Sequence, residues 1–246
     1  MEYLQDLNKN QREAVVHENG PCLVIAGAGS GKTRVLTYRI AHLINSDVDP
    51  FSILALTFTN KAAKEMKDRI EKIVGTEARS LWMGTFHSIF ARILRSEGYK
   101  LGYPPNFVIY DTQDSKSLIK SIVKELNLDL KIYKENFVYN RISNAKNRLI
   151  SYIDYANNPI LQEEDASALR PRISEIYKIY VNRCFKSHAM DFDDLLFNTN
   201  ILFSEHIDVL NKYQQLFQHV LIDEFQDTNY CQYLITKKIA AVNRNI

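Results

Sequence analysis

The stretch "VIAGAGSGKTRVL", residues 24–36, holds three of the eight glycines of the chain within five positions, followed directly by a lysine and a threonine. The overlapping run "CLVIAG", residues 22–27, is apolar, rich in β-branched side chains and of strand length. Residues 31–44 then carry apolar side chains at helical spacing. The sequence therefore predicts a buried strand that enters a helix through a glycine-rich turn.

This turn has the features of a phosphate-binding P-loop. Glycines can adopt backbone angles that are closed to other residues, so successive N–H groups can converge on an anion at the helix N-terminus. Lys32 adds a mobile positive charge, and Thr33 adds a hydroxyl suited to coordinating magnesium. A turn that merely connects two elements would not need this lysine and threonine. The predicted phosphate-binding residues are Ala26, Gly27, Ala28, Gly29, Ser30, Gly31, Lys32 and Thr33.

A second acidic segment, "HVLIDEFQDTN" at residues 219–229, is predicted to complete the site. Asp223 follows an apolar strand end, at the carboxyl edge of a parallel sheet where ligands bind. There it can hold Mg²⁺ through water, while Glu224 can accept a proton from the attacking water. The alternative is that these acids cap the next helix.

Composition narrows the class of protein. The chain has 246 residues, 46% hydrophobic and 24% charged, which is typical of a folded globular protein with one or two cores. Three widely spaced cysteines match neither a metal cluster nor a disulfide framework, and we interpret them as reduced thiols. No apolar run approaches the ~20 residues that span a bilayer, and no secretory leader is evident. We expect a cytoplasmic protein without membrane contact, and a net charge of +2 does not by itself indicate a nucleic-acid partner.

Six segments in this order resemble the motifs of UvrD/Rep/PcrA-type superfamily 1 DNA helicases. They are "LNKNQREAV" (7–15), "AGAGSGKT" (26–33), "ALTFTNKAAKEM" (55–66), "GTFHS" (84–88), "DFDDLL" (191–196) and "LIDEFQDTN" (221–229). The resemblance covers nearly the whole chain, and alanine at position 26, where the general P-loop has glycine, is typical of this family. It implies an α/β fold, with a RecA-like parallel sheet flanked by helices and an inserted, mainly α-helical domain.

The resemblance also assigns roles around the nucleotide, with ATP and Mg²⁺ as the implied cofactors. Gln11 matches the glutamine that binds the adenine edge through its paired donor and acceptor. Arg34 resembles an arginine near the base and phosphates, although a surface salt bridge is an equal alternative. Gln226 resembles the residue that senses the γ-phosphate or its attacking water, and Asp227 its supporting acid. Lys32, Asp223, Glu224 and Gln226 are then the catalytic residues, with Thr33 and Asp223 holding the metal.

Single-stranded DNA and single-strand/duplex junctions are the partners that the resemblance implies. Phe58 would stack on a base, while Thr59 and Asn60 would donate to phosphates. Residues 61–100 carry nine Lys and Arg against five Asp and Glu, although a solvated charged helix face would look the same. Asn60 is predicted to cap the helix that follows residues 53–59. Three further candidates for DNA contact are Thr85, Phe86 and His87, of which His87 is otherwise an ordinary turn histidine.

The 190 residues between Lys32 and Asp223 exceed what a compact nucleotide-binding fold needs. We therefore expect a first part of the core at residues 1–110, an inserted helical domain at 111–190 and a second part of the core at 191–246. The insert is expected to be helical at about 112–126, 135–149 and 166–187, with loops around Pro159 and Pro171. "DFDDLL" is read as a helix start capped by Asp191 and Asp194 rather than as a metal site.

The leading hypothesis is the N-terminal motor half of an ATP-dependent 3′–5′ DNA helicase of repair or replication. The resemblance implies that the chain stops before its second motor domain, which supplies arginines to the reaction, so we expect these residues alone to be nearly inert. One alternative is the motor part of a RecB/AddA-like helicase-nuclease subunit. Another is a nucleic-acid-binding module without turnover, against which the intact Lys32, Thr33, Asp223, Glu224 and Gln226 argue.

Overall fold

The computed structural model describes residues 2–27 and 29–246, which form two compact units. The first unit comprises the residues up to Ile89, together with Phe203–Thr228 and Gln232–Ile246. The second comprises Phe90–Leu202 and Asn229–Cys231. The expected helical insert, residues 111–190, lies within the second unit.

A sheet of three parallel strands forms the centre of the first unit, in the order β2 (Trp82–Thr85), β1 (Ile53–Thr57) and β5 (His219–Ile222). Leu54 of β1 lies opposite Trp82 on one side and Val220 on the other. Strand β1 is buried along its whole length, as its continuous apolar sequence predicts for a central parallel strand. Because all three strands run in the same direction, their carboxyl ends meet at one edge, and the parallel α/β prediction is confirmed.

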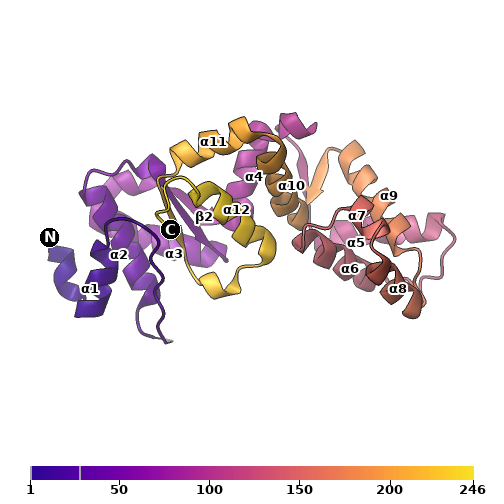
Figure 1. The fold of residues 1–246 in the computed structure, drawn as a ribbon, viewed down its shortest axis with the longest axis horizontal. Coiled ribbons are helices and arrows are strands. Elements are labelled where there is room, and N and C mark those ends of the chain that lie inside the picture. Colours follow the sequence, from indigo (N-terminus) through magenta and orange to yellow (C-terminus); the bar gives the residue numbers. More distant parts are fainter. Residues whose placement is uncertain (1, 28) are drawn as a thin grey trace. The chain divides into compact units, whose positions relative to one another are not determined.

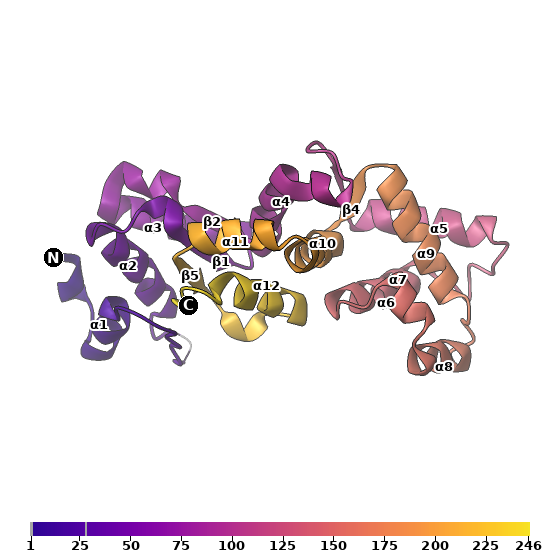
Figure 2. The ribbon, with the colours of Figure 1, turned by 45° about the horizontal axis from the view of Figure 1, so that its top comes forward.

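Helices pack against this sheet. Ile40 of α2 (Lys32–Asn45) and Ile70 of α3 (Asn60–Val74) share a core cluster with Ala55 of β1, and Figures 1 and 2 show α2 and α3 on the same side of the strands. Trp82 is half-buried and makes edge contacts with the rings of Tyr213 and Phe217, at or next to α11 (Ile207–Leu216). The remaining elements that contribute to this unit are η1 (Glu2–Asp6), α1 (Lys9–Val16), η2 (Pro50–Ser52), η3 (Gly75–Ser80), α4 (Phe86–Glu97), η5 (Phe225–Asp227) and α12 (Tyr230–Ala240).

The strand predicted at residues 22–27 is not formed, and this prediction was wrong. Residues 21–27, all of which the structure describes, have no regular secondary structure, and the side chains of Leu23 and Ile25 are 70% and 87% exposed. The edge of β5 is bonded elsewhere, since Val220 N donates to Asn245 O at 2.9 Å. A strand needs a free edge to pair with, and an apolar run alone does not reveal whether that edge is available.

The second unit is mainly helical, with a short parallel pair of strands, β3 (Val108–Tyr110) and β4 (Ala189–Asp191). Its other elements are η4 (Gly98–Leu101), α5 (Thr112–Glu125), α6 (Glu135–Asn147), α7 (Tyr152–Ala156), α8 (Pro159–Ser167), α9 (Ile173–Lys186) and α10 (Phe192–Glu205). The predictions for α5 and α6 are confirmed within two residues. Helix α8 was missed because Pro159 was taken as a loop marker, whereas proline at the first helical position, here behind the cap Asn158, is a helix start.

A buried ionic cluster lies at the C-terminal end of α6. The ammonium of Lys146, only 1% exposed, contacts Asp191 Oδ2 and Asp194 Oδ1 at 2.7 Å each, and Tyr180 Oη donates to Asp191 Oδ2 at 2.7 Å. At the start of α10, Asp191 N donates to Asp194 Oδ2 and Asp194 N donates to Asp191 Oδ1, as predicted for a capping pair. The "DFDDLL" segment is therefore a helix cap that closes around a buried lysine.

The two carboxyl groups of this cluster have opposite pKa shifts. Burial and the neighbouring Asp191 raise the pKa of Asp194 to about 7, against the opposing effect of Lys146. At Asp191, burial is outweighed by the charge and hydrogen bond of Lys146 and by the hydrogen bond of Tyr180, so its pKa is lowered. The same two carboxylates outweigh burial at Lys146 and raise its pKa.

The pKa of Asp194 predicts that part of the stability is lost as pH rises. Its folded-state pKa lies above the unfolded value, so its contribution is complete below about pH 4 and lost as pH rises through about 7. We expect the free energy of unfolding, measured with urea at pH 5 and pH 8, to fall less in Asp194→Asn than in the unchanged chain. Burial lowers the pKa of His42 and His219, which act in the opposite sense in both proteins. An equal fall in the two proteins would contradict the assignment.

Candidate functional site

The glycine-rich turn leads directly into α2, whose first residue is Lys32. Gly29 and Gly31 have positive φ angles of 75° and 88°, which L-residues other than glycine rarely adopt. The Lys32 ammonium donates to Ala26 O at 2.9 Å and to Gly27 O at 3.3 Å. The lysine side chain is thus bonded to the backbone of the turn that precedes it. Ala28, predicted to contact phosphate, lies outside the described residues.

Gln11 lies against the same turn. Its Nε2 donates to Ser30 O at 3.0 Å, while its Oε1 accepts from Asn8 N in the capping box of α1. A Cβ at Gly31 would come within 2.9 Å of Gln11 Nε2, so this position has room only for glycine unless the glutamine moves. The side chain predicted to bind adenine is thus positioned beside the P-loop, with both ends of its amide engaged.

Asp223 and Glu224 follow β5 at the carboxyl edge of the sheet. Burial and the neighbouring Glu224 raise the pKa of Asp223, while Lys32 opposes this shift. Glu224 has left-handed backbone angles, φ 49° and ψ 48°, which cost on the order of 1 kcal/mol in a residue other than glycine. Gln226 Nε2 donates to Glu224 Oε2 at 2.5 Å.

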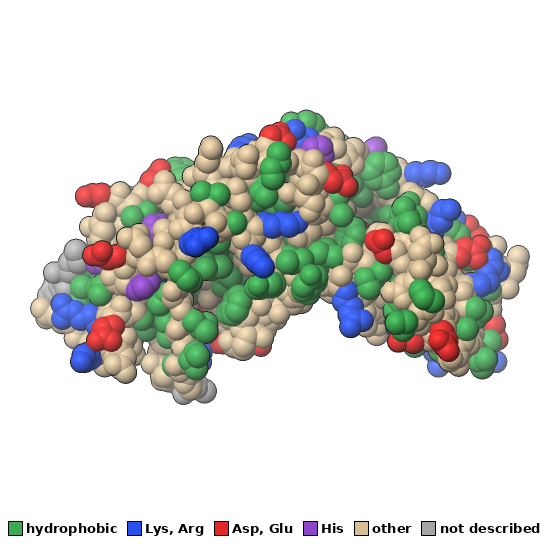
Figure 3. All heavy atoms as spheres, in the orientation of Figure 1, with side chains coloured by type: hydrophobic (Ala, Val, Ile, Leu, Met, Phe, Trp, Pro, Cys, Tyr) green, Lys and Arg blue, Asp and Glu red, His purple; other side chains and the backbone are tan. Residues whose placement is uncertain are grey.

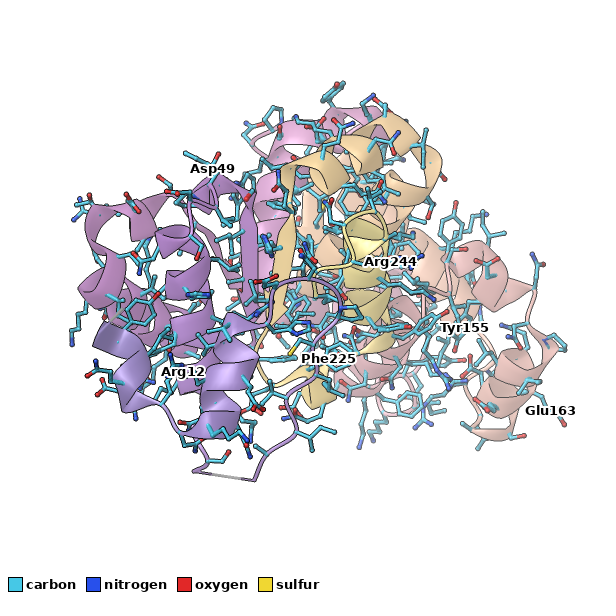
Figure 4. The ribbon with its side chains drawn as sticks, turned by 60° about the vertical axis from the view of Figure 1, so that its left-hand side comes forward. Arg12, Asp49, Tyr155, Glu163, Phe225 and Arg244 are labelled. Atoms are coloured by element: carbon cyan, nitrogen blue, oxygen red, sulfur yellow. The ribbon has the colours of Figure 1, made fainter. Side chains whose placement is uncertain are left out.

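Two cavities of the first unit bring the P-loop and the acids together. Lys32, Asp223 and Glu224 line a cavity of about 1040 Å³, together with apolar residues of the 21–26 segment. Phe225 and Arg244, both labelled in Figure 4, also line it. A second cavity of about 380 Å³ is lined by Thr33, Asp223, Glu224 and Asp227, and by Thr57, Phe58 and Thr59 after β1. Residues that are 190 positions apart in the sequence therefore share one site.

The side chain of Arg34 lies beside Asp6 and Tyr38. Its Nη2 lies 3.8 Å from Asp6 Oδ2 in an exposed ion pair, and its guanidinium carbon lies 5.4 Å from the ring centre of Tyr38. The surface salt bridge that the sequence left open as an alternative is therefore present. Exposed pairs of this kind contribute about 0–1 kcal/mol, so Arg34 can leave Asp6 at little cost.

The sequence did not reveal the role of Arg39 in this unit. Arg39 Nη1 donates to the carbonyl oxygens of Ala14, Val15 and His17 at 3.2, 3.4 and 2.6 Å, at the C-terminal end of α1. A cation in this position satisfies helix-end carbonyls and fixes α1, the helix of Gln11, to α2. Backbone partners of this kind leave no signal in residue identities.

The candidate DNA-binding residues lie at the ends of β1 and β2. Thr59 is exposed and caps α3 through a hydrogen bond from Ala62 N, so the cap lies one residue before the predicted Asn60, which is the first helical residue. The rings of Phe58 and Phe86 are 5.5 Å apart between centroids. Phe86 is only 1% exposed, so it occupies a core position instead of the expected surface position and supports Phe58 from behind.

Thr85 and His87 flank Phe86. The Thr85 side chain is largely buried, and its Oγ1 accepts from Ser88 N at 3.2 Å at the start of α4, which makes it a helix cap. His87 is half-buried. Of the six residues predicted to contact DNA, the more accessible ones are therefore Phe58, Thr59 and Asn60.

On the face that Figure 3 shows, Lys and Arg side chains are interspersed with Asp and Glu, consistent with the small net charge.

The donor set suits a divalent cation that arrives with a nucleotide. The Thr33 side chain offers a hydroxyl oxygen and Asp223 a carboxylate, both on the same cavity. Within the described part of the chain, no three His, Cys, Asp or Glu side chains group as metal ligands. A hard cation such as Mg²⁺ fits this sparse set, because it usually takes one or two protein oxygens and completes its shell with phosphates and water.

None of the helices within residues 2–27 and 29–246 has the length and apolar character that a membrane crossing requires.

Comparison with known proteins gives consistent matches. The family model described as "UvrD/REP helicase N-terminal domain" matches residues 7–246. The chain is 43% identical over 244 residues to the "ATP-dependent DNA helicase PcrA" of Staphylococcus aureus (strain Mu50 / ATCC 700699), and 44% identical over 244 residues to the PcrA of Staphylococcus epidermidis (strain ATCC 12228 / FDA PCI 1200). Each match covers 99% of this chain but 33% of the relative, so the chain spans about a third of the length of these curated proteins.

Proposed function

Because this chain belongs to the UvrD/Rep helicase family through its N-terminal domain, we propose that it is the ATP-binding half of a motor that translocates on single-stranded DNA. The observation that carries this proposal is the shared site of the P-loop and the acids. Lys32 and Thr33 begin α2, Asp223 and Glu224 follow β5, and both pairs line cavities at the same sheet edge. The names of the matched relatives, which are ATP-dependent DNA helicases, support the same function.

The side chains divide the work of phosphoryl transfer in this proposal. The Lys32 ammonium exchanges its two carbonyl partners for phosphate oxygens, which bear a full charge and bind it more strongly. Thr33 and Asp223 would hold Mg²⁺, which when bound neutralises charge on the phosphates. Glu224 accepts the proton of the attacking water, and Gln226, already bonded to Glu224, orients that water.

The DNA strand is proposed to run over the residues that follow β1. Phe58 presents an aromatic face for stacking, and the neighbouring Thr59 and Asn60 are exposed donors suited to phosphates. Phe58 and Thr59 also line the smaller cavity with Asp223 and Glu224, which supports a direct link between nucleotide and strand. Movement from 3′ to 5′, a role in repair or replication, and junction DNA as a substrate belong to the same proposal.

Binding of oligo(dT) to the chain tests this function. We expect Phe58→Ala to weaken binding roughly tenfold, because stacking on an aromatic ring contributes about 1–3 kcal/mol per base. Affinity should also fall with rising salt as phosphate contacts are screened. Fluorescence anisotropy at two salt concentrations measures both effects.

Two further variants control this experiment. Phe58→Leu keeps an apolar neighbour for Phe86 and removes the stacking face, so it should lose affinity without loss of thermal stability. Phe51→Ala removes an exposed phenylalanine just before β1 and should leave binding unchanged. Saturable DNA binding that is equal in all four proteins would exclude the proposed path, and a lack of nucleotide binding by the unchanged chain would overturn the proposed function itself.

A further inference from the structure

Helix α1 is attached to α2 and to the turn before it at two points, and the first of these is Gln11. Its Nε2 donates to Ser30 O at 3.0 Å, next to Gly31, the N-cap of α2. Both helices lie within the first unit, and Figures 1 and 2 show α1 beside α2. The Gln11 amide therefore joins the N-terminal part of α1 to the start of α2, at the P-loop.

The second attachment is the guanidinium of Arg39, near the middle of α2. It donates to three carbonyl oxygens at the C-terminal end of α1, those of Ala14, Val15 and His17. The last carbonyl groups of a helix have no partner within that helix, so these bonds satisfy the end of α1. Ala14 lies three residues after Gln11, which is about 4.5 Å along a helix axis. The bonds of Arg39 therefore begin within one turn of the Gln11 backbone.

Helix α1 depends on such attachments because it is short. It has 8 residues, and isolated helices below about 12–15 residues are marginal in water. Among residues 9–16, all of which the structure describes, Val15 alone is buried, in a cluster with Val35 of α2. An apolar contact is non-directional, so it does not by itself fix the rotation or register of the helix. Hydrogen bonds are directional, and those of Arg39 supply this constraint.

The Gln11 amide keeps one donor and one acceptor for a ligand. Its Nε2 gives one of two hydrogens to Ser30 O, and its Oε1 uses one of two lone pairs to accept from Asn8 N. Adenine offers the complementary pair, an N7 acceptor and an N6 amino donor, whereas guanine has the O6 acceptor in place of the donor. A contact through both amide atoms distinguishes the two bases only when the amide is held in register with the base edge.

We propose that Arg39 is a positioning residue for base selection: by bonding the C-terminal carbonyl groups of α1, it holds Gln11 in the register that distinguishes adenine from guanine. This inference rests on the proposed ATP-binding function and on the predicted contact of Gln11 with adenine. Arg39 also lines the larger cavity together with Lys32. The competing account is therefore a direct contact between its guanidinium and the phosphates, which would not depend on the base.

The preference for ATP over GTP tests this inference. Arg39→Met removes the donors and keeps a long unbranched side chain, so α1 loses its hydrogen bonds to α2 but keeps its apolar contact. We expect the ratio of the GTP and ATP dissociation constants to fall roughly fivefold in Arg39→Met and roughly tenfold in Gln11→Ala, within the range for a contact through both amide atoms. Inorganic triphosphate, which has no base, should bind Arg39→Met and the unchanged chain equally. Competition against a fluorescent ATP analogue measures all three ligands.

Three further variants separate the possible outcomes. The double variant Gln11→Ala/Arg39→Met should lose no more preference than Gln11→Ala, because Arg39 acts through Gln11. Arg39→Lys keeps a cation for the carbonyl groups and should restore at least half of the lost preference. Arg79→Met makes the same substitution at an arginine whose side chain is 69% exposed, and should have no effect.

Three results would overturn the role of Arg39 and leave the proposed function intact. They are an unchanged ratio in Arg39→Met, a loss of triphosphate binding in Arg39→Met, and additive losses in the double variant. Equal binding of ATP and GTP by the unchanged chain would also overturn the inference, because there would be no base preference to set. Failure of the unchanged chain to bind ATP at all would instead remove the proposed function.

Discussion

Replacement of Lys32 by alanine is expected to weaken the binding of ATP roughly 100-fold, the largest effect on binding among the substitutions considered for this chain. Each hydrogen bond between charged groups contributes about 1.5–3 kcal/mol, and about 1.4 kcal/mol corresponds to a tenfold change in affinity. The Lys32 ammonium donates to Ala26 O and Gly27 O, so its removal also releases the turn that is proposed to bind the phosphates. Titration of a fluorescent ATP analogue measures the loss.

Two further variants identify the cause of the lost ATP affinity in Lys32→Ala. Glu224→Gln keeps the size of the side chain and removes its negative charge, so it should bind ATP within about threefold of the unchanged chain while abolishing the ability to accept a proton. Lys61→Ala removes a lysine whose side chain is 87% exposed and should have no effect on ATP binding. Equal losses of affinity in Lys32→Ala and Glu224→Gln would contradict the separate roles of phosphate binding and proton transfer.

Replacement of Lys146 by alanine is expected to lower the free energy of unfolding by about 3–5 kcal/mol, the largest effect on stability. Removal of one partner from a buried ion pair leaves the other charge without compensation in a medium of low polarity. Here two carboxylates, Asp191 and Asp194, would face each other without the ammonium that contacts both at 2.7 Å. Urea unfolding, followed by circular dichroism, measures the change.

The rest of the cluster provides the controls. In Lys146→Met combined with Asp191→Asn and Asp194→Asn, no charge is left unpaired, and most of the lost stability should return. Lys124→Met, at an exposed position of α5, should change the stability by less than about 0.5 kcal/mol. A loss below about 1 kcal/mol in Lys146→Ala would show that the cluster is not a stabilising anchor of the second unit.

Local patterns predicted much of the first unit correctly. Strand β5 and helices α2 and α3 lie where the sequence predicted them. The glycine pattern also identified the turn, since Gly29 and Gly31 have the positive φ angles that favour glycine. These features depend on residues that are near each other in the chain. The spacing of their apolar side chains and the positions of glycine can be read directly from the sequence.

Features that depend on distant partners were predicted less well. Residues 22–27 have the composition of a buried strand but form no strand. The edge of β5 is bonded to another segment, since Val220 N donates to Asn245 O. Phe86 was predicted to contact DNA together with Thr85 and His87, but packing places it in the core. Nor did the sequence indicate that Arg39 would bind the end of α1 or that Asn147 would bind Asn229.

The sequence by itself revealed the motifs of the candidate site: a lysine and a threonine after a glycine-rich turn, and an acid pair after an apolar strand, are recognisable because each motif is local. Only the tertiary structure decided that these motifs share one site. The physical reason is that hydrogen bonds and burial depend on which surfaces meet. Residues 190 positions apart meet only when the sheet assembles.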